Sequence, residues 1–254
     1  MKYVKMATWA ALIGLVFMLP LSSVAQDDPK GKPGHQVVEP PSQRSETAAA
    51  MPVYEPPRRS APGGRIGGST RGMGIVPMLS ALAPDHTGLT THEQPSLFWY
   101  LTRATTYPVE FTITDDQATQ PLLETRLSGP FDAGMQRVRL ADYGVRLSLG
   151  VPYRWFVALV IDPNSPSRDN IAGGTIERLA PPTALRAKLT RAGTAQAPSI
   201  YAEAGLWYDA LAATADLLDA APNDPALRQQ HASLLEQVGL RQIAEHDTRR
   251  SRAQ

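Results

Sequence analysis

The loop from Asp85 to Glu93 gathers side chains that bind metal ions in other proteins: two imidazoles, His86 and His92, and a carboxylate at each end. Imidazole and carboxylate ligands suit zinc or nickel. The spacing matches no established metal motif, and polar loops are common at protein surfaces. A polar surface loop is therefore the favoured interpretation, and metal binding is the alternative.

A second loop, from Asp162 to Asn170, is rich in oxygen-bearing side chains and invites comparison with calcium sites. An EF-hand loop needs a ligand at its fifth position and glycine at its sixth. Pro166 and Ser167 stand there instead. The sequence thus predicts a turn rich in aspartate, asparagine and proline, and we expect neither a metal ion nor a cofactor.

No arrangement typical of an enzyme's nucleophile and base occurs in the chain. There is no cysteine, which excludes thiolate nucleophiles, disulfides and cysteine-based zinc sites. The Gly-x-Ser-x-Gly elbow of hydrolases is also missing. His231 lies near the apolar stripe of a predicted helix, and the pair Asp115-Asp116 lies at a strand end or turn, which is poor geometry for acid and base. We predict a protein that is not an enzyme, with a hydrolase of unrecognised site as an alternative.

Two aromatic clusters are the candidate binding residues. Trp99 and Tyr100 lie in a predicted strand, and Trp207, Tyr208 and Asp209 lie in a predicted helix. Exposed aromatic side chains are the usual anchors of recognition surfaces, so one set of rings on an outer face would bind a polysaccharide or a protein. Packing in the core and between sheet and helices is the other interpretation, and it is the more common role of such residues.

Residues 1–25 have the pattern of a cleavable secretory signal peptide. Two lysines supply a positive start, Ala7 to Leu19 is almost wholly apolar, and small residues lead to Ala25. The apolar run ends at Pro20, short of the ~20 residues that span a bilayer. We expect cleavage after Ala25 and export to the periplasm or the extracellular space, with no transmembrane span in the mature chain.

Residues 26–74 are rich in proline, glycine, serine and charge, which predicts a disordered linker. The last third, from Arg58 to Gly74, mixes arginine with glycine and could touch an anionic polymer, although a flexible spacer is the simpler interpretation. The formal net charge of the whole chain is only +1. The sequence therefore predicts no uniformly basic surface and no nucleic-acid partner.

Residues 75–180 alternate short apolar runs with turn residues, which predicts an antiparallel β-sandwich of immunoglobulin-like type. In one run Val109, Phe111 and Ile113 alternate with polar residues, the period of a strand with one face in solvent. The candidate strands are Ile75–Leu82, Leu97–Thr102, Val109–Thr114, Leu122–Leu127, Met135–Leu140, Tyr153–Ile161 and Gly174–Leu179.

A local pattern within this region resembles the tyrosine corner of such sandwiches. Leu147 would fill the core below the corner, and Gly150 would allow a tight turn. Tyr153 would fold its hydroxyl back onto upstream backbone, and Trp155 follows it in the same strand. These four residues are the predicted structural determinants of the sheet region.

After Pro181-Pro182 the apolar period changes from two to about 3.6 residues, so residues 181–246 predict a helical unit packed on the sandwich. Residues 247–254 predict a disordered basic tail. The expected helices are Thr183–Ala192, closed by Gly193; Pro198–Ala220; and a third that begins at Pro225 after the cap Asp224 and ends before Gly239.

The second and third of these helices are similar to a single tetratricopeptide unit. Tyr201, Ala210 and Pro222 stand at matching offsets, whereas Pro198 replaces a small residue of that pattern. No second copy of the pattern occurs in the sequence. One isolated repeat cannot bury its own apolar face, so we expect this hairpin to dock on the sandwich or on a partner.

Several of these segments together resemble the bacterial "domain of unknown function 928" family. They are Gly88-Leu89-Thr90 followed by Pro95-x-x-Phe98-Trp99-Tyr100, the strand Tyr153-Arg154-Trp155, and the helix Ala204-Gly205-Leu206-Trp207-Tyr208-Asp209-Ala210. The resemblance covers roughly Arg65 to Ile243. It implies an exported protein of a largely cyanobacterial family without an assigned activity, and it supplies no catalytic residues.

The leading hypothesis from the sequence is a non-catalytic protein of the cell envelope that acts as a protein-interaction or scaffolding module. A carbohydrate-binding module that uses exposed aromatic rings is one alternative, and a hydrolase is another. The expected partner is another envelope protein or a polysaccharide. The sequence does not determine the oligomeric state.

Overall fold

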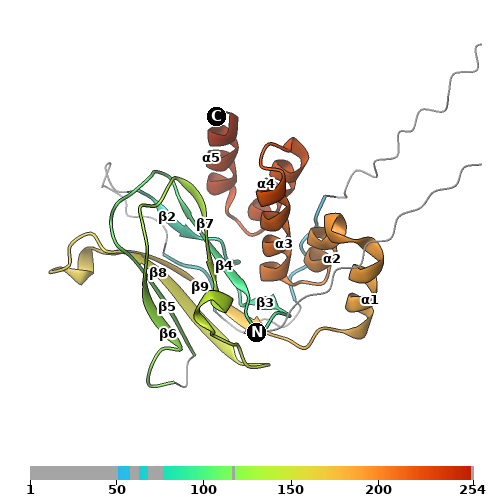
Figure 1. Cartoon of the computed structure of the whole chain (residues 1–254), viewed down its shortest axis with the longest axis horizontal. Helices are drawn as coiled ribbons and strands as arrows, with labels where there is room; N and C mark the ends of the chain where they lie inside the picture. The colour runs from blue at the N-terminus through green and yellow to red at the C-terminus, as the bar shows by residue number, and fades with distance from the viewer. Residues whose placement is uncertain (1–50, 58–62, 68–76, 116–117, 253–254) are drawn as a thin grey trace, which may run out of the picture. The chain divides into compact units, whose positions relative to one another are not determined.

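The computed structural model describes residues 51–57, 63–67, 77–115 and 118–252. Residues from Thr47 to the end of the chain belong to one compact unit, with antiparallel sheets first and helices after them (Figure 1). The predicted signal peptide and most of the predicted linker lie outside the described residues. No helix in the described ranges is long and apolar enough to cross a bilayer.

Strands come first along the chain and helices follow them, as the apolar periods predict. The strands are β1 (Ile66–Gly67), β2 (Leu79–Ala81), β3 (Gly88–Thr90), β4 (Ser96–Leu101), β5 (Val109–Asp115), β6 (Leu123–Leu127), β7 (Gly134–Arg139), β8 (Pro152–Leu159) and β9 (Asn170–Arg178). The helices are α1 (Thr183–Ala192), α2 (Ala197–Glu203), α3 (Trp207–Ala220), α4 (Pro225–Gln237) and α5 (Arg241–Arg252).

The strands form two sheets that share one hydrophobic core. The larger sheet has the order β1-β9-β8-β5-β6, and the smaller has the order β2-β4-β7. Antiparallel pairing is confirmed in all of these ladders. The exception is β3, which pairs parallel with β9, with Gly88 opposite Ile176. The sequence predicted only a polar loop there, because a strand of three residues is too short to show a period.

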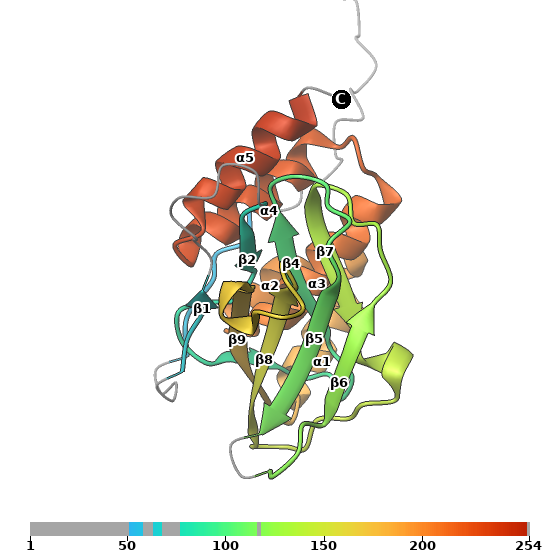
Figure 2. The same cartoon turned by 90° about the vertical axis from the view of Figure 1, so that its left-hand side faces the viewer.

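The smaller sheet lies between the larger sheet and the helices, as Figures 1 and 2 show. Its central strand, β4, is therefore covered on both faces. Tyr100 faces the helices, where its hydroxyl lies 3.0 Å from Nδ1 of His246 on α5. Trp99 faces the opposite way and packs edge-on against Phe131 at 5.5 Å between ring centroids. This arrangement explains why β4 is a continuous apolar run with no polar face.

In the helical region the predicted cap Asp224 is confirmed, whereas one predicted helix is wrong. The carboxylate of Asp224 accepts hydrogen bonds from the backbone N–H groups of Ala226 and Leu227, as an N-cap does. The predicted helix Pro198–Ala220 is divided into α2 and α3. Gly205 lies at the division with a φ of 73°, a left-handed conformation that a continuous helix cannot contain and that glycine adopts without strain.

Two segments predicted to be disordered are ordered where the structure describes them. In the predicted linker, Tyr54 is buried, Glu55 donates its N–H to the carbonyl of Ala202, and β1 extends the larger sheet. In the predicted tail, α5 continues to Arg252. Both segments gain their order from tertiary contacts, which their polar compositions do not reveal.

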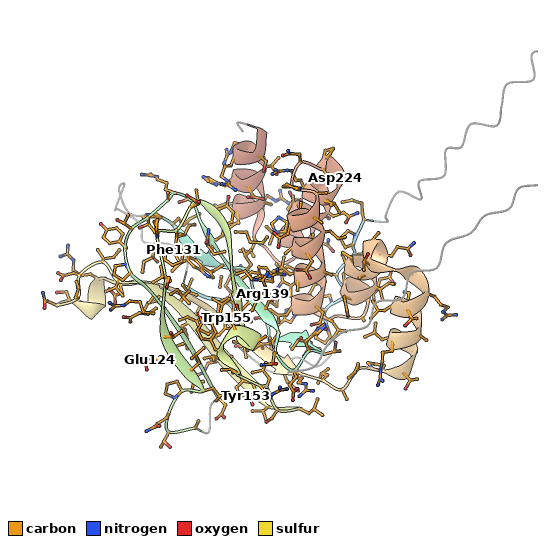
Figure 3. All side chains as sticks on the ribbon, viewed as in Figure 1. Glu124, Phe131, Arg139, Tyr153, Trp155 and Asp224 are labelled. Atoms are coloured by element: carbon orange, nitrogen blue, oxygen red, sulfur yellow. The ribbon has the colours of Figure 1, made fainter. Side chains whose placement is uncertain are left out.

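The hydrogen bond that the sequence predicts for Tyr153 is present. Its hydroxyl oxygen accepts from the N–H of Ser148 at 3.1 Å, and Leu147 and Trp155 lie in the core. Gly150 turns the chain with a φ of 69° and donates its N–H to the carbonyl of Arg178. Figure 3 shows Tyr153 and Trp155 on the same strand, β8.

Replacing Tyr153 by phenylalanine should lower the free energy of unfolding by about 1 kcal/mol, the usual contribution of one hydrogen bond. The Ser148 N–H loses its acceptor while the ring remains packed. Chemical denaturation monitored by circular dichroism measures the change. The matched control is Tyr143→Phe, at a ring that is 40% exposed, and equal stability of the two variants would contradict the prediction.

Candidate functional site

The first turn of α3 is fastened to three strands or strand ends by consecutive side chains. Trp207 donates its indole N–H to the carbonyl of Leu82 at 2.9 Å. The hydroxyl of Tyr208 accepts from the indole N–H of Trp155 at 2.9 Å and donates to the carbonyl of Thr175 at 3.1 Å. All of these contacts are buried, so each polar group replaces the water it loses with a protein partner.

The aromatic residues that the sequence proposes for binding are all in the interior. Trp99, Tyr100, Trp207 and Tyr208 are each at most 1% exposed, and Asp209 is 2% exposed. The prediction of an exposed aromatic surface at these positions is therefore wrong. The physical reason is the layering: β4 has a covered face on each side, and α3 inserts its first turn against β3 and β9.

Asp209 completes the first turn of α3 and is the centre of a buried polar cluster. Its Oδ1 accepts from the hydroxyl of Thr90, and its Oδ2 accepts from the N–H and hydroxyl of Thr91 at 2.8 and 2.7 Å. Nδ1 of His92 lies 3.1 Å from Oδ1. Four donors thus surround one carboxylate, which offsets the cost of removing its charge from water.

His92 is held by this carboxylate while the rest of its ring reaches solvent. The side chain is 55% exposed although its partner is 1% exposed. The hydrogen bond and charge of Asp209 raise the pKa of His92, and partial burial opposes the shift. Because Nδ1 serves Asp209, Nε2 is the nitrogen left for a ligand.

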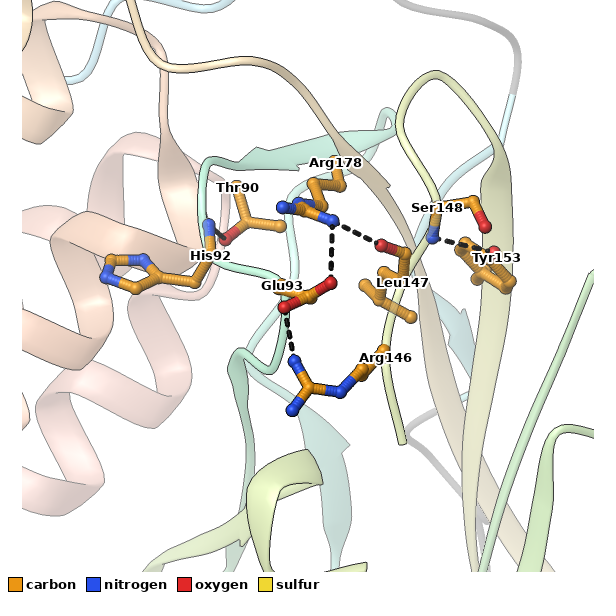
Figure 4. A network of polar contacts seen from close by, with 8 residues as sticks. All are labelled: Thr90, His92, Glu93, Arg146, Leu147, Ser148, Tyr153 and Arg178. Atoms are coloured by element: carbon orange, nitrogen blue, oxygen red, sulfur yellow. Dashed lines mark hydrogen bonds and ion pairs between the residues drawn. The ribbon is translucent and has the colours of Figure 1, made fainter. Parts of the chain in front are cut away.

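The backbone around His92 is fixed by a second polar network, shown in Figure 4. Glu93 pairs with Arg146 at 2.5 Å and with Arg178 at 3.5 Å. Arg178 also donates to the carbonyl of Leu147 at 2.8 Å. Figure 4 shows the imidazole of His92 pointing away from this network, toward the helices. The segment is therefore anchored on one side and presents its histidine on the other.

The imidazole of His92 opens into a groove of about 550 Å³ between α3, the segment before β4, and β7. Much of its lining is apolar and comes from α3, including Ala212, Ala213 and Leu217. Two arginines of β7 also line it. Arg137 is paired with Asp216 at 2.5 Å and with Asp219 at 3.4 Å, so its charge is largely compensated.

Arg139, the second arginine, is exposed and also lines the groove; it is labelled in Figure 3. Among the described residues, no acidic side chain forms an ion pair with it. The groove therefore combines an apolar floor with two cationic groups, the Arg139 guanidinium and the His92 imidazole when it is protonated. Such a surface suits a ligand with an apolar part and an anionic part.

The two histidines considered as metal ligands, His86 and His92, do not face a common site. Nε2 of His86 lies 2.8 Å from the hydroxyl of Tyr54, and its Nδ1 lies 3.0 Å from the carboxylate of Asp85. His92 instead contacts Asp209. Within the described ranges, no group of three or more histidine, aspartate or glutamate side chains is arranged to hold a metal ion.

In the loop from Asp162 to Asn170, also considered for metal binding, the carboxylates accept hydrogen bonds from nearby backbone groups. Asp162 accepts from the backbone N–H of Asn164 at 3.0 Å, and Asp169 accepts from the N–H of Ile161 at 3.2 Å. These are the contacts of a turn, in which an aspartate satisfies nearby backbone donors.

The family model described as "Domain of Unknown Function (DUF928)" matches residues 66–248. The chain belongs to the DUF928 family. The matched part includes every strand and almost all of the helical region, so the DUF928 domain contains the groove and both polar networks. No curated protein matches the chain.

The buried cluster around Asp209 and the groove beside it include residues to which the sequence assigned no role. Thr90 and Thr91 are separated from Asp209 by 119 and 118 positions, and Arg139 lies at the end of a strand without a distinguishing pattern. His92 and Asp209 were each singled out, but for separate roles. Only the packing of α3 on β3 brings them together.

We expect the stabilising contact between His92 and Asp209 to depend on pH. The folded-state pKa of His92 is raised, so its stabilisation is fully present below the unfolded value of about 6.5 and is lost as the pH rises through the folded value. The difference in unfolding free energy between the parent protein and His92→Gln should therefore be larger in acid than in mild alkali. Denaturant titrations across this range measure it.

An NMR titration of the His92 imidazole gives the matched control. In Asp209→Asn the pKa of His92 should fall, because the carboxylate charge that raises it is gone. A His92 titration curve that is the same in both proteins would contradict the assignment of Asp209 as the cause.

Proposed function

We propose that this DUF928 protein is an exported, non-catalytic interaction module that holds a segment of a partner protein in the groove beside His92. The observation that carries the proposal is a combination in one groove of an imidazole held by Asp209, an apolar helix face, and the Arg139 guanidinium, which has no acidic partner among the described residues. A partner segment with an apolar side chain next to a carboxylate matches these groups in polarity and charge.

The apolar floor supports a protein segment as the occupant. Ala212 and Ala213 are small and partly buried, so α3 leaves room along one face instead of filling it. Apolar side chains of a partner gain free energy by entering such a groove, and Arg139 and His92 would orient an acidic neighbour at its mouth.

A hydrolase is the second candidate, because a histidine oriented by an aspartate is the general base of many hydrolytic sites. That role needs a nucleophile or a positioned water at the free nitrogen. In the described part of the chain, no serine or threonine hydroxyl is bonded to Nε2 of His92. The groove therefore favours binding over hydrolysis.

Export and a place in the cell envelope are part of the proposal and rest on the leader-like residues 1–25. The immunoglobulin-like character of the sheets and the tetratricopeptide-like character of the helical hairpin remain predictions. Both are in keeping with an interaction module, because each architecture presents grooves and surfaces more often than catalytic centres.

A photo-crosslinking amino acid at Ala213 should capture the partner segment in cells, because this position lines the floor of the groove. The same crosslinker at Ala187, an exposed position of α1, is the control for random encounters. The measured quantity is the amount of crosslinked product at each position.

Arg139→Gln should reduce the crosslinked product from Ala213 strongly while leaving the folded structure intact, since Arg139 is exposed. Equal products at Ala213 and Ala187, or no effect of Arg139→Gln, would count against the groove as the binding site.

Mass spectrometry of the protein recovered from cells tests export. The mature chain should begin at Gln26, directly after the predicted cleavage site. A recovered chain that still begins at Met1 would overturn cleavage of the leader.

A further inference from the structure

A second hollow, separate from the groove, lies between α5 and the loop that follows β4. Its volume is about 540 Å³, and it is lined by Thr102, Arg103, Ala133, His246, Arg249 and Arg250. Three guanidinium groups and an imidazole thus meet at one place, although the whole chain carries a formal net charge of only +1. We call these six residues the basic cleft.

We propose that the basic cleft binds a phosphate group. Arginine guanidinium groups suit tetrahedral oxyanions because they donate several hydrogen bonds in a planar arrangement. This site is independent of the groove beside His92 and does not rest on the function proposed for it.

The imidazole of the basic cleft is held in place by β4. Nδ1 of His246 lies 3.0 Å from the hydroxyl of Tyr100, and the two rings meet edge-on at 5.7 Å. Figure 2 shows α5 lying across the end of the sheet where β4 terminates. Since Nδ1 is used by Tyr100, Nε2 is the nitrogen available to a ligand in the cleft.

Arg250 is positioned by a close approach to β7. Gly134, the first residue of β7, has a φ of 116°, and a Cβ atom there would lie 2.6 Å from Nη2 of Arg250. Only glycine leaves room for the guanidinium at this position. The Nε atom of Arg250 is buried without a hydrogen-bond partner, so the guanidinium has donor capacity that the described protein groups do not use.

Thr102 supplies a neutral donor at the same place. Its Oγ1 accepts the backbone N–H of Met78 at 2.9 Å, which leaves the hydroxyl hydrogen free to point elsewhere. Arg249 is exposed on α5, and no described acidic side chain pairs with it. Asp247, an acidic residue beside the cluster, is engaged by Tyr100 and His231, and its carboxylate also interacts with the charge of Arg250.

Arg249 therefore brings to the cleft a positive charge that no acidic side chain among the described residues matches. Its repulsion with the neighbouring cations would be relieved by a bound phosphate. The contacts that hold His246 and Arg250 in place lower the ordering cost of binding.

Isothermal titration calorimetry with inorganic phosphate, at ionic strength held constant with chloride, tests the free anion. We expect saturable binding by the full chain and about tenfold weaker binding by Arg249→Gln, the loss expected for one charged hydrogen bond. The double variant Arg103→Gln/Arg249→Gln should bind more weakly still. Arg186→Gln, which removes the same charge from an exposed position of α1, should bind like the parent protein.

Vesicles of phosphatidylglycerol, compared with vesicles of phosphatidylcholine, test whether the phosphate belongs to a lipid headgroup. Binding to the anionic vesicles that is lost in Arg249→Gln but kept in Arg186→Gln would support a lipid phosphate, even if inorganic phosphate binds weakly. Circular dichroism confirms that each variant is folded. The proposal is overturned if neither probe binds, or if Arg249→Gln and Arg186→Gln affect binding equally.

Discussion

Burying three polar side chains at the start of α3 is the constraint on which the arrangement of sheets and helices depends. Trp207, Tyr208 and Asp209 are consecutive, so they point in different directions around the helix, and each needs a hydrogen-bond partner in the interior. The partners lie after β2, in β8 and β9, and around β3. A rotation or shift of α3 would leave several of them unsatisfied at once, so one relative position of helix and sheets is favoured.

This anchored helix decides where ligands can bind. The helices α3 and α5 cover one face of the smaller sheet, and the larger sheet covers the other. The aromatic residues of β4 are therefore buried in the core. Among the described residues, hollows lie beside the layers, including one along α3, where Ala212 and Ala213 are small, and one at the end of β4, where α5 crosses it. The arginine and histidine side chains that line these hollows, and not the aromatic rings of β4, are therefore the groups that a ligand would contact.

The two hollows handle charge in different ways. Along α3, Arg137 is matched by Asp216 and Asp219, and the carboxylate of Asp209 is surrounded by donors. That groove has modest charge and an apolar floor, which suits a segment of a protein. In the basic cleft three arginines and His246 gather, and Arg249 has no acidic partner among the described residues, which suits a compact anion. The two proposed ligands would then occupy separate places on the domain and would not compete.

Much of the fold could be predicted from local signals. Period-two alternation in β5, the proline and aspartate at the start of α4, and Tyr153 folding back onto Ser148 all depend on residues close in the sequence. The parallel strand β3, the break at Gly205, the buried Tyr54 and the helical end of the chain had weak local signals or none. The sequence by itself thus determined that strands precede helices, where most of the longer elements lie, and the family. Only the tertiary structure decided which polar residues meet, because Asp209 and Thr91 lie 118 positions apart and their contact exists only once α3 has packed on the sheet.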